Sequence, residues 1–117
     1  MATIVPTVTA PGKRRIRAVW ANMASGDVGA VVDIARYADK TVQVDIGTAG
    51  DGSLEMQGSN DGTTFAAMKE PDGTVITGVT TDGELFALLE NPRDVRPSIA
   101  GTTGSGWTVT LEAVASG

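Results

Sequence analysis

Four Asp-Gly pairs recur through the middle of the chain at intervals of ten, eleven and ten residues: Asp51-Gly52, Asp61-Gly62, Asp72-Gly73 and Asp82-Gly83. Asp-Gly favours tight two-residue turns, because these turns need a positive φ that glycine adopts without steric cost. The interval matches one short strand followed by one turn. The spacing therefore predicts antiparallel β-structure in which successive strands are joined by hairpins, as in a meander.

Short segments of alternating apolar and polar residues support this prediction. The clearest is residues 41–46, and residues 15–21, 53–59 and 107–113 show the same pattern, which puts every second side chain on one face of a strand. Roughly eight short strands with glycine-rich turns favour two packed sheets over a single meander, because a single sheet leaves most of its apolar surface exposed to water. We predict an all-β fold, an antiparallel, jelly-roll-like β-sandwich.

The first residues of the chain differ from the rest. Pro6 and Pro11 interrupt a β-branched stretch, and prolines confine such a stretch to a sheet edge or an extended arm. We therefore predict an extended N-terminal arm, residues 1–14, and a single β-sandwich domain, residues 15–117. The basic residues follow the first apolar stretch, which is not the order of a secretion signal, and no apolar run reaches the roughly 20 residues needed to span a bilayer.

Charge is distributed unevenly along the chain, whose net charge is −5. Residues 1–20 contain Lys13, Arg14, Arg15 and Arg17 and no acidic residue, whereas the remainder carries five basic and 14 acidic residues. A basic cluster of this kind has three interpretations: contact with nucleic-acid phosphates, contact with an acidic protein surface, or a solvated strand edge. With only four charges and no aromatic platform for stacking bases, we do not expect direct binding to nucleic acid.

The composition argues against catalysis. Cysteine and histidine are absent, which removes thiol chemistry, the commonest general base and the commonest transition-metal ligand. The aspartates are spread one per turn, whereas a calcium loop groups its oxygen ligands within one segment. We therefore expect no enzymatic activity, no cofactor and no metal site.

Three segments together resemble a known family: Tyr37–Val44 (YADKTVQV), Gln57–Phe65 (QGSNDGTTF) and Glu90–Pro97 (ENPRDVRP). Their order and spacing are similar to those of small proteins encoded near the major capsid gene of tailed bacteriophages. The family often has Trp where this chain has Phe65, and Tyr-Ile where it has Asp94-Val95. The resemblance covers roughly residues 30–114.

Family members with an assigned role are capsid decoration, or cement, proteins, which are jelly-roll-like sandwiches. The resemblance implies a non-enzymatic protein made in the host cytoplasm, located on the outer capsid surface of the virion, with the major capsid protein as partner. It also implies a homodimer, or alternatively a trimer. We expect the partner contacts to come from the N-terminal region: Ile4, Val5, Lys13, Arg14, Arg15 and Arg17.

Two other functions remain open from the sequence. One is a carbohydrate-binding β-sandwich module for host attachment, because the Ser59-Asn60-Asp61-Gly62 turn followed by an aromatic residue is similar to a hairpin of discoidin-type sugar-binding sandwiches. The other is a head–tail or tail assembly component. For the capsid-binding hypothesis, we expect removal of residues 1–17 to weaken attachment without unfolding the sandwich.

Overall fold

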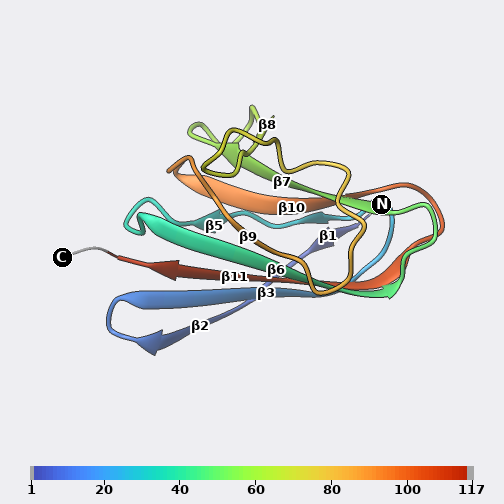
Figure 1. Cartoon of the computed structure of the whole chain (residues 1–117). Coiled ribbons are helices and arrows are strands. Elements are labelled where there is room, and N and C mark those ends of the chain that lie inside the picture. The colour runs from blue at the N-terminus through green and yellow to red at the C-terminus, as the bar shows by residue number, and fades with distance from the viewer. Residues whose placement is uncertain (1, 116–117) are drawn as a thin grey trace.

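The computed structural model describes residues 2–115, which form β-strands and no helix (Figure 1). The strands, in chain order, are β1 (Thr3–Ile4), β2 (Thr7–Gly12), β3 (Arg15–Met23), β4 (Val28–Gly29), β5 (Val32–Asp33), β6 (Asp39–Thr48), β7 (Ser53–Ser59), β8 (Ala66–Ala67), β9 (Leu85–Ala87), β10 (Asp94–Ala100) and β11 (Ser105–Val114).

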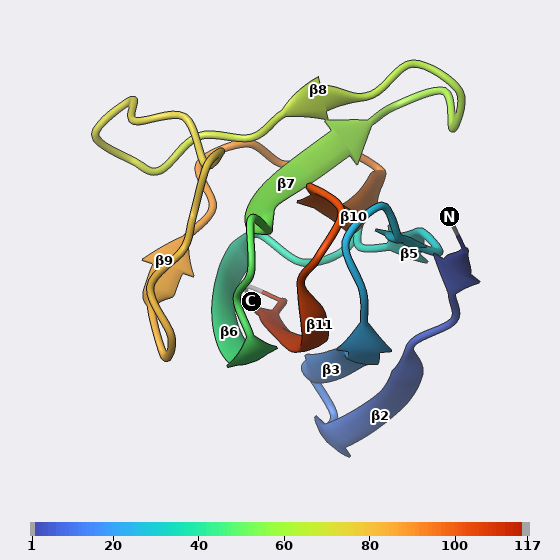
Figure 2. The same cartoon turned by 90° about the vertical axis from the view of Figure 1, so that its right-hand side faces the viewer.

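Two sheets pack face to face, as Figure 2 shows in a view along the strands. The first, which we call the β10 sheet, has the order β1-β4-β10-β7-β8, with β5 also paired to β10. The second, the β11 sheet, has the order β2-β3-β11-β6-β9. All strand pairs are antiparallel except β1 with β4, which is parallel. The predicted all-β, antiparallel, jelly-roll-like sandwich is confirmed.

The core lies between the sheets and contains the residues that alternation placed on the inner face. Val42 and Val44 of β6 and Leu54 and Met56 of β7 are fully buried. Trp20 of β3 and Trp107 of β11 are the largest fully buried side chains. Because aromatic rings bury the most apolar area per residue, these two indoles contribute strongly to the core of a small domain.

The four Asp-Gly turns divide into two kinds. Asp61-Gly62 lies between the paired strands β7 and β8, and Asp72-Gly73 lies between the bridge partners Lys69 and Val75. Asp51-Gly52 and Asp82-Gly83 instead join one sheet to the other: β6 to β7, and the segment beside β7 to β9. The meander is therefore wrong as a description of the connections, because local turn chemistry does not specify whether the chain stays in one sheet.

The N-terminal residues are extended, as predicted, but they are paired with the body. β1 pairs with β4 in the β10 sheet, and β2 pairs with β3 in the β11 sheet. The predicted boundary between residues 14 and 15 lies inside the β2–β3 hairpin. Proline tolerates this arrangement because both strands lie at sheet edges, where one side needs no hydrogen-bond donor. The expected separate arm is thus corrected to two edge strands that connect the two sheets.

Candidate functional site

The β2–β3 hairpin carries the predicted basic residues at one end of the sandwich. Lys13 and Arg14 form the turn, and Arg15 and Arg17 begin β3; all four side chains are exposed. Alternation along β3 directs Arg15 and Arg17 to the outer face of the β11 sheet, because Ile16 and Ala18 face inward. We call Lys13, Arg14, Arg15 and Arg17 the basic hairpin.

Glu112 of β11 holds the two arginines of β3. Arg17 lies directly opposite Glu112 in the antiparallel register, and its Nε donates to Glu112 Oε1 at 2.5 Å. An Arg15 guanidinium nitrogen lies 3.8 Å from Glu112 Oε2. Within residues 2–115, Lys13 and Arg14 form no ion pair. The hairpin therefore presents at least two uncompensated cations beside two pre-positioned arginines.

Sequence reasoning did not identify Glu112 as the partner of these arginines. Its only signal is an acidic residue on the outward face of a strand, and such a residue meets Arg17 only once the strand register is known.

The two apolar residues of the predicted partner set lie elsewhere. Ile4 is half-buried and packs against the core, while its carbonyl oxygen accepts a hydrogen bond from Ala30 N–H at 2.8 Å. Val5 is 78% exposed and lies between β1 and β2. The structure thus brings the four cations of the predicted set together in one hairpin. It does not bring the two apolar residues to that hairpin: Val5 is exposed between β1 and β2, and Ile4 packs against the core.

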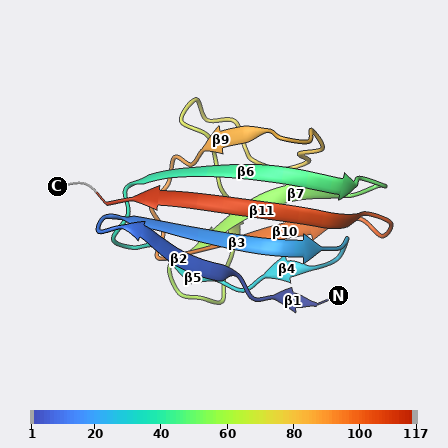
Figure 3. The same cartoon turned by 90° about the horizontal axis from the view of Figure 1, so that it is seen from below.

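The opposite end of the sandwich differs from the basic hairpin in its charged residues. It is built from the loops at residues 24–27, 47–52 and 101–106, which contain Asp27 and Asp51 and no lysine or arginine. The N–H of Ser25 donates to Gly104 O at 3.0 Å, which holds two of these loops together. The molecule measures 43 Å along its longest principal axis, so the basic hairpin is far from this end (Figure 3).

The three segments that carry the phage-family resemblance meet near the basic end. Lys40 of β6 is buried, and its Nζ donates to Asn91 Oδ1 and to the Ala38 carbonyl oxygen. Asn60 Oδ1 accepts the N–H of Arg93 at 3.0 Å. Since β6 belongs to the β11 sheet and residue 91 leads into β10 of the other sheet, the contact of Lys40 with Asn91 fastens the two sheets together. The contact of Asn60 with Arg93 instead joins the end of β7 to the start of β10 within the β10 sheet.

Burial lowers the pKa of the Lys40 ammonium, and the charges of Asp39 and Glu90 oppose that shift. A buried polar group is costly unless it is hydrogen-bonded, so Lys40 and Asn91 are best understood as structural residues. Residues of the three segments therefore hold the sandwich together at this end.

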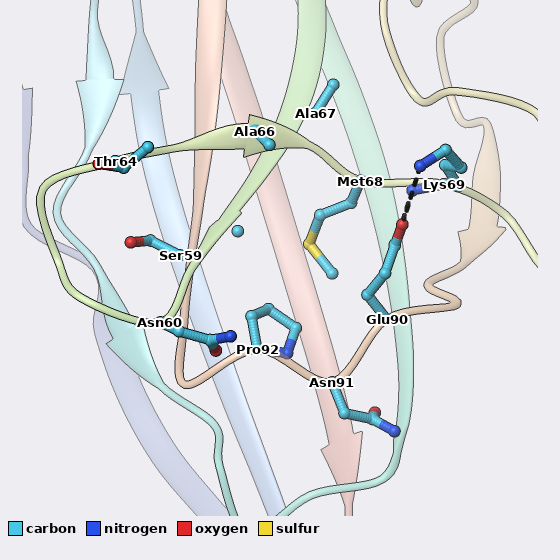
Figure 4. Close-up of a pocket in the computed structure, with 11 residues that line it drawn as sticks. Ser59, Asn60, Thr64, Ala66, Ala67, Met68, Lys69, Glu90, Asn91 and Pro92 are labelled. Atoms are coloured by element: carbon cyan, nitrogen blue, oxygen red, sulfur yellow. Dashed lines mark hydrogen bonds and ion pairs between the residues drawn. The ribbon is translucent and has the colours of Figure 1, made fainter.

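An open pocket of about 390 Å³ lies beside the contact between Lys40 and Asn91, and Asn91 is part of its lining. Figure 4 shows its lining, with Asn60 and Pro92 on one side and the Lys69–Glu90 ion pair on the other. The nitrogen–oxygen distance of that pair is 3.5 Å, and Glu90 Oε1 also accepts the N–H of Lys69 at 2.9 Å. The charged groups of the pocket are thus already paired with each other.

The aspartates of the turns are occupied by the backbone. Asp61 Oδ1 accepts the N–H groups of Thr63 and Thr64, and Asp51 Oδ1 accepts those of Thr102 and Thr103. These hydrogen bonds lower the pKa of both carboxyl groups well below the usual range. Within residues 2–115, no group of three or more His, Cys, Asp or Glu residues is arranged to hold a metal ion.

In the same range there is no helix that is long and apolar enough to cross a membrane. No protein-family model matches the sequence, and the curated protein sequences contain no match.

Two solved structures show the fold. The SPBc2 prophage-derived protein YomS is similar with a TM-score of 0.68 and 11% identity, over 92% of this chain and 100% of that one. Peruvianin-I, a cysteine peptidase from Thevetia peruviana latex, is similar with a TM-score of 0.53 and 15% identity, over 94% of this chain and 60% of that one. At such identities the likeness shows a shared fold and nothing further.

Proposed function

We propose that this protein is a structural protein of a tailed bacteriophage that binds the outer surface of the capsid and stabilises contacts between major capsid proteins. The observation that carries the proposal is the exposed basic hairpin on a chain whose net charge is −5. A concentrated cationic patch on an acidic domain fits an acidic protein surface, because arginine guanidinium groups bind carboxylates through two parallel hydrogen bonds.

The comparison with YomS supports the phage part of the proposal, since that prophage-derived protein shares the fold over its whole length. The three sequence segments that resemble the capsid-decoration family add to this support. In the structure they form one connected junction through the contacts of Lys40 with Asn91 and of Asn60 with Arg93.

A two-sheet body with an exposed charged hairpin suits attachment to a repetitive shell. Each ion pair at an exposed site contributes little, typically below about 1 kcal/mol. Repeated contacts between an assembled decoration layer and a symmetric capsid can still add up to firm binding through multivalency. The proposal therefore needs no deep pocket and no catalytic group.

The aromatic residues give less support to the carbohydrate-binding alternative. Trp20, Trp107 and Phe86 are buried, and Tyr37 packs against the core. The Arg96 guanidinium carbon lies 3.6 Å from the centre of the Phe65 ring. Aromatic rings are a frequent part of small-molecule pockets, and the rings of this chain are largely committed to internal contacts.

Cosedimentation with empty capsids of the same phage tests the proposal. Reversing the two turn charges in the variant Lys13→Glu/Arg14→Glu should weaken attachment by about tenfold or more, because carboxylates then face an acidic surface. A control variant that also gains two carboxylates, Thr48→Glu/Ala49→Glu, places them at the opposite end and should attach as the wild type does. Equal attachment of all three proteins would refute binding through the basic hairpin.

A further inference from the structure

The four Asp-Gly pairs carry a chemistry that the proposed function does not use. In such a pair the backbone nitrogen of the glycine can attack Cγ of the aspartate, because glycine has no Cβ to hinder the approach. Each pair is therefore a candidate site of a spontaneous backbone rearrangement: Asp51-Gly52, Asp61-Gly62, Asp72-Gly73 and Asp82-Gly83. The structure distinguishes the pairs by what holds each aspartate and each glycine in place.

The rearrangement passes through a cyclic imide and needs no enzyme. The bond from the glycine nitrogen to Cγ forms, the bond from Cγ to its hydroxyl oxygen breaks, and the amide proton leaves with that hydroxyl group as water. Hydrolysis then opens the ring. Cleavage between nitrogen and Cγ restores aspartate. Cleavage of the original peptide bond gives isoaspartate, in which the chain runs through Cβ and Cγ and the former main-chain carbonyl group is the free carboxylate.

The attack requires each turn to open, because the aspartate carboxylate and the glycine N–H of every pair are hydrogen-bonded in the folded protein. Local opening costs least where these hydrogen bonds stay within an exposed turn, and most where they reach another element of the fold. A pair that is held only by its own turn should therefore rearrange first.

The Asp51-Gly52 pair is tied to a distant loop. Asp51 Oδ1 accepts the N–H groups of Thr102 and Thr103, each at 2.8 Å. The Gly52 N–H donates to Ala49 O at 2.8 Å, and Gly52 is buried. Release of both reactants would separate two loops at this end of the molecule, so the fold holds the pair in place.

The Asp82-Gly83 pair is tied to β6. Asp82 Oδ1 accepts the N–H of Ile46 at 2.7 Å. The Gly83 N–H donates to Val44 O at 2.8 Å, and Gly83 O accepts a hydrogen bond from Gln43 Nε2 at 3.1 Å. The turn must therefore detach from the β11 sheet before the glycine nitrogen reaches the aspartate side chain.

The Asp61-Gly62 pair is held by a buried hydroxyl group. The Gly62 N–H donates to Ser59 Oγ at 3.0 Å, and Ser59 Oγ donates to Asp61 Oδ1 at 2.9 Å. Ser59 is 4% exposed. Asp61 Oδ1 also accepts the N–H groups of Thr63 and Thr64. A single side chain of β7 thus fixes both reactants.

The Asp72-Gly73 pair differs from these three. Among the residues that the structure describes, its hydrogen bonds stay within the turn: Asp72 Oδ1 accepts the N–H of Thr74, and the Gly73 N–H donates to Glu70 O, both at 2.9 Å. Residues 71–75 are all exposed, and a Cβ at Gly73 would meet nothing within 4 Å. The turn lies in the connection between β8 and β9, which projects from the sandwich (Figure 2).

We propose that Asp72-Gly73 is the pair at which this protein first forms isoaspartate, while the fold protects the other three pairs. The rearrangement inserts Cβ into the backbone at the tip of the hairpin closed by the Lys69–Val75 bridge. Because this tip lies outside both sheets, the sandwich should keep its unfolding temperature. The inference concerns the protein alone and does not rest on capsid binding.

Incubation of the purified full-length protein at neutral pH, followed by digestion, peptide separation and mass spectrometry, measures isoaspartate at each pair. The same incubation in urea gives the rates of the unfolded chain. Asp61 and Asp72 are a matched comparison, since each is followed by Gly-Thr, and they should react at similar rates in urea. In the folded protein Asp72 should react at least about tenfold faster than Asp61, because its turn opens without detaching from another element.

Two variants test what controls the rates. Asp72→Glu should remove the early product, because a glutamate would have to close a larger ring. Ser59→Ala removes the hydroxyl group that holds Asp61 and Gly62, so it should raise the rate at Asp61 several-fold and leave the rate at Asp72 unchanged. The urea unfolding midpoint of each variant verifies that it is folded, and the comparison within the wild type decides the proposal without them.

Two results would overturn the proposal: a folded protein in which any other Asp-Gly pair forms isoaspartate as fast as Asp72, or one in which Asp72 stays unchanged although it reacts in urea. The readout is a chemical change in the isolated protein, so a failure here is distinguishable from a failure to bind capsids.

Discussion

The aspartates of the turns act at the scale of single residues as acceptors for backbone N–H groups. Asp51 joins the 47–52 loop to Thr102 and Thr103, which lie in the loop before β11. Asp61 binds the N–H groups within its own hairpin turn. Aspartate thus stabilises a local turn at position 61 and connects two loops that are distant in sequence at position 51.

The lowered pKa of these carboxyl groups makes the stability of the fold depend on pH. Because the folded-state pKa lies below the ordinary value of 3.8, the ionised carboxylates stabilise the fold above pH 3.8. This stabilisation is lost as pH falls further towards the folded-state pKa. We expect the unfolding free energy of the wild type, measured by urea denaturation, to fall more steeply below pH 3.8 than that of Asp51→Asn/Asp61→Asn.

Asp45→Asn is the control for this experiment, because within residues 2–115 the Asp45 carboxylate accepts no hydrogen bond. It should follow the wild-type curve. If the double variant also follows that curve, these carboxylates do not act as described.

At the scale of the strands, Gly29 of β4 shows how closely the two sheets approach. A Cβ atom at this position would lie 2.5 Å from Pro97 Cδ and 2.6 Å from Trp20 Nε1. The indole has little freedom to move away, because Trp20 Nε1 donates to Ala30 O at 2.9 Å. A glycine is therefore needed at the point where β4 crosses over the core tryptophan.

Gly29→Ala should lower the unfolding free energy by about 1–3 kcal/mol, the usual range for adding a methyl group to a packed interior. The control is Gly12→Ala, where the added Cβ would meet only Arg15 Cγ at 3.9 Å. That change should stay within about 0.5 kcal/mol of the wild type. Similar unfolding midpoints for both variants in urea would contradict the packing around Trp20.

Strand positions were largely predictable from sequence, whereas strand partners were not. Alternation alone identified the buried faces of β3, β6, β7 and β11, because a period of two is a local property. It did not show that the chain changes sheet at Asp51-Gly52. Nor did it reveal the bulge in β3, where the register with β11 shifts between Val109 and Trp107 and Asn22 has a φ of 56°.

The N-terminal strands illustrate the same limit. Pro6 and Pro11 indicated an edge strand or an arm, and only pairing with β4 and β3 decides between them. Removal of residues 1–17 would delete part of β3, the central partner of β2 and β11. The structure therefore predicts that this truncation destabilises the sandwich, in contrast to the expectation from the sequence, and charge reversal at the hairpin is the appropriate test.

At the scale of the whole molecule, the fold converts a charge difference along the sequence into a charge difference in space. The sequence already indicated that Lys13, Arg14, Arg15 and Arg17 form a basic cluster. Their location at one end, opposite the loop end that holds Asp51, depends on how the hairpin is placed in the sheet.

Electron cryomicroscopy of capsids decorated with the wild-type protein shows where the sandwich binds and which of its ends faces the shell. Attachment through the basic hairpin predicts density for the sandwich on the outer surface of the shell, with the β2–β3 hairpin and its basic residues against the major capsid protein. Density confined to the neck or tail, or a sandwich whose Asp51 end faces the shell, would contradict it.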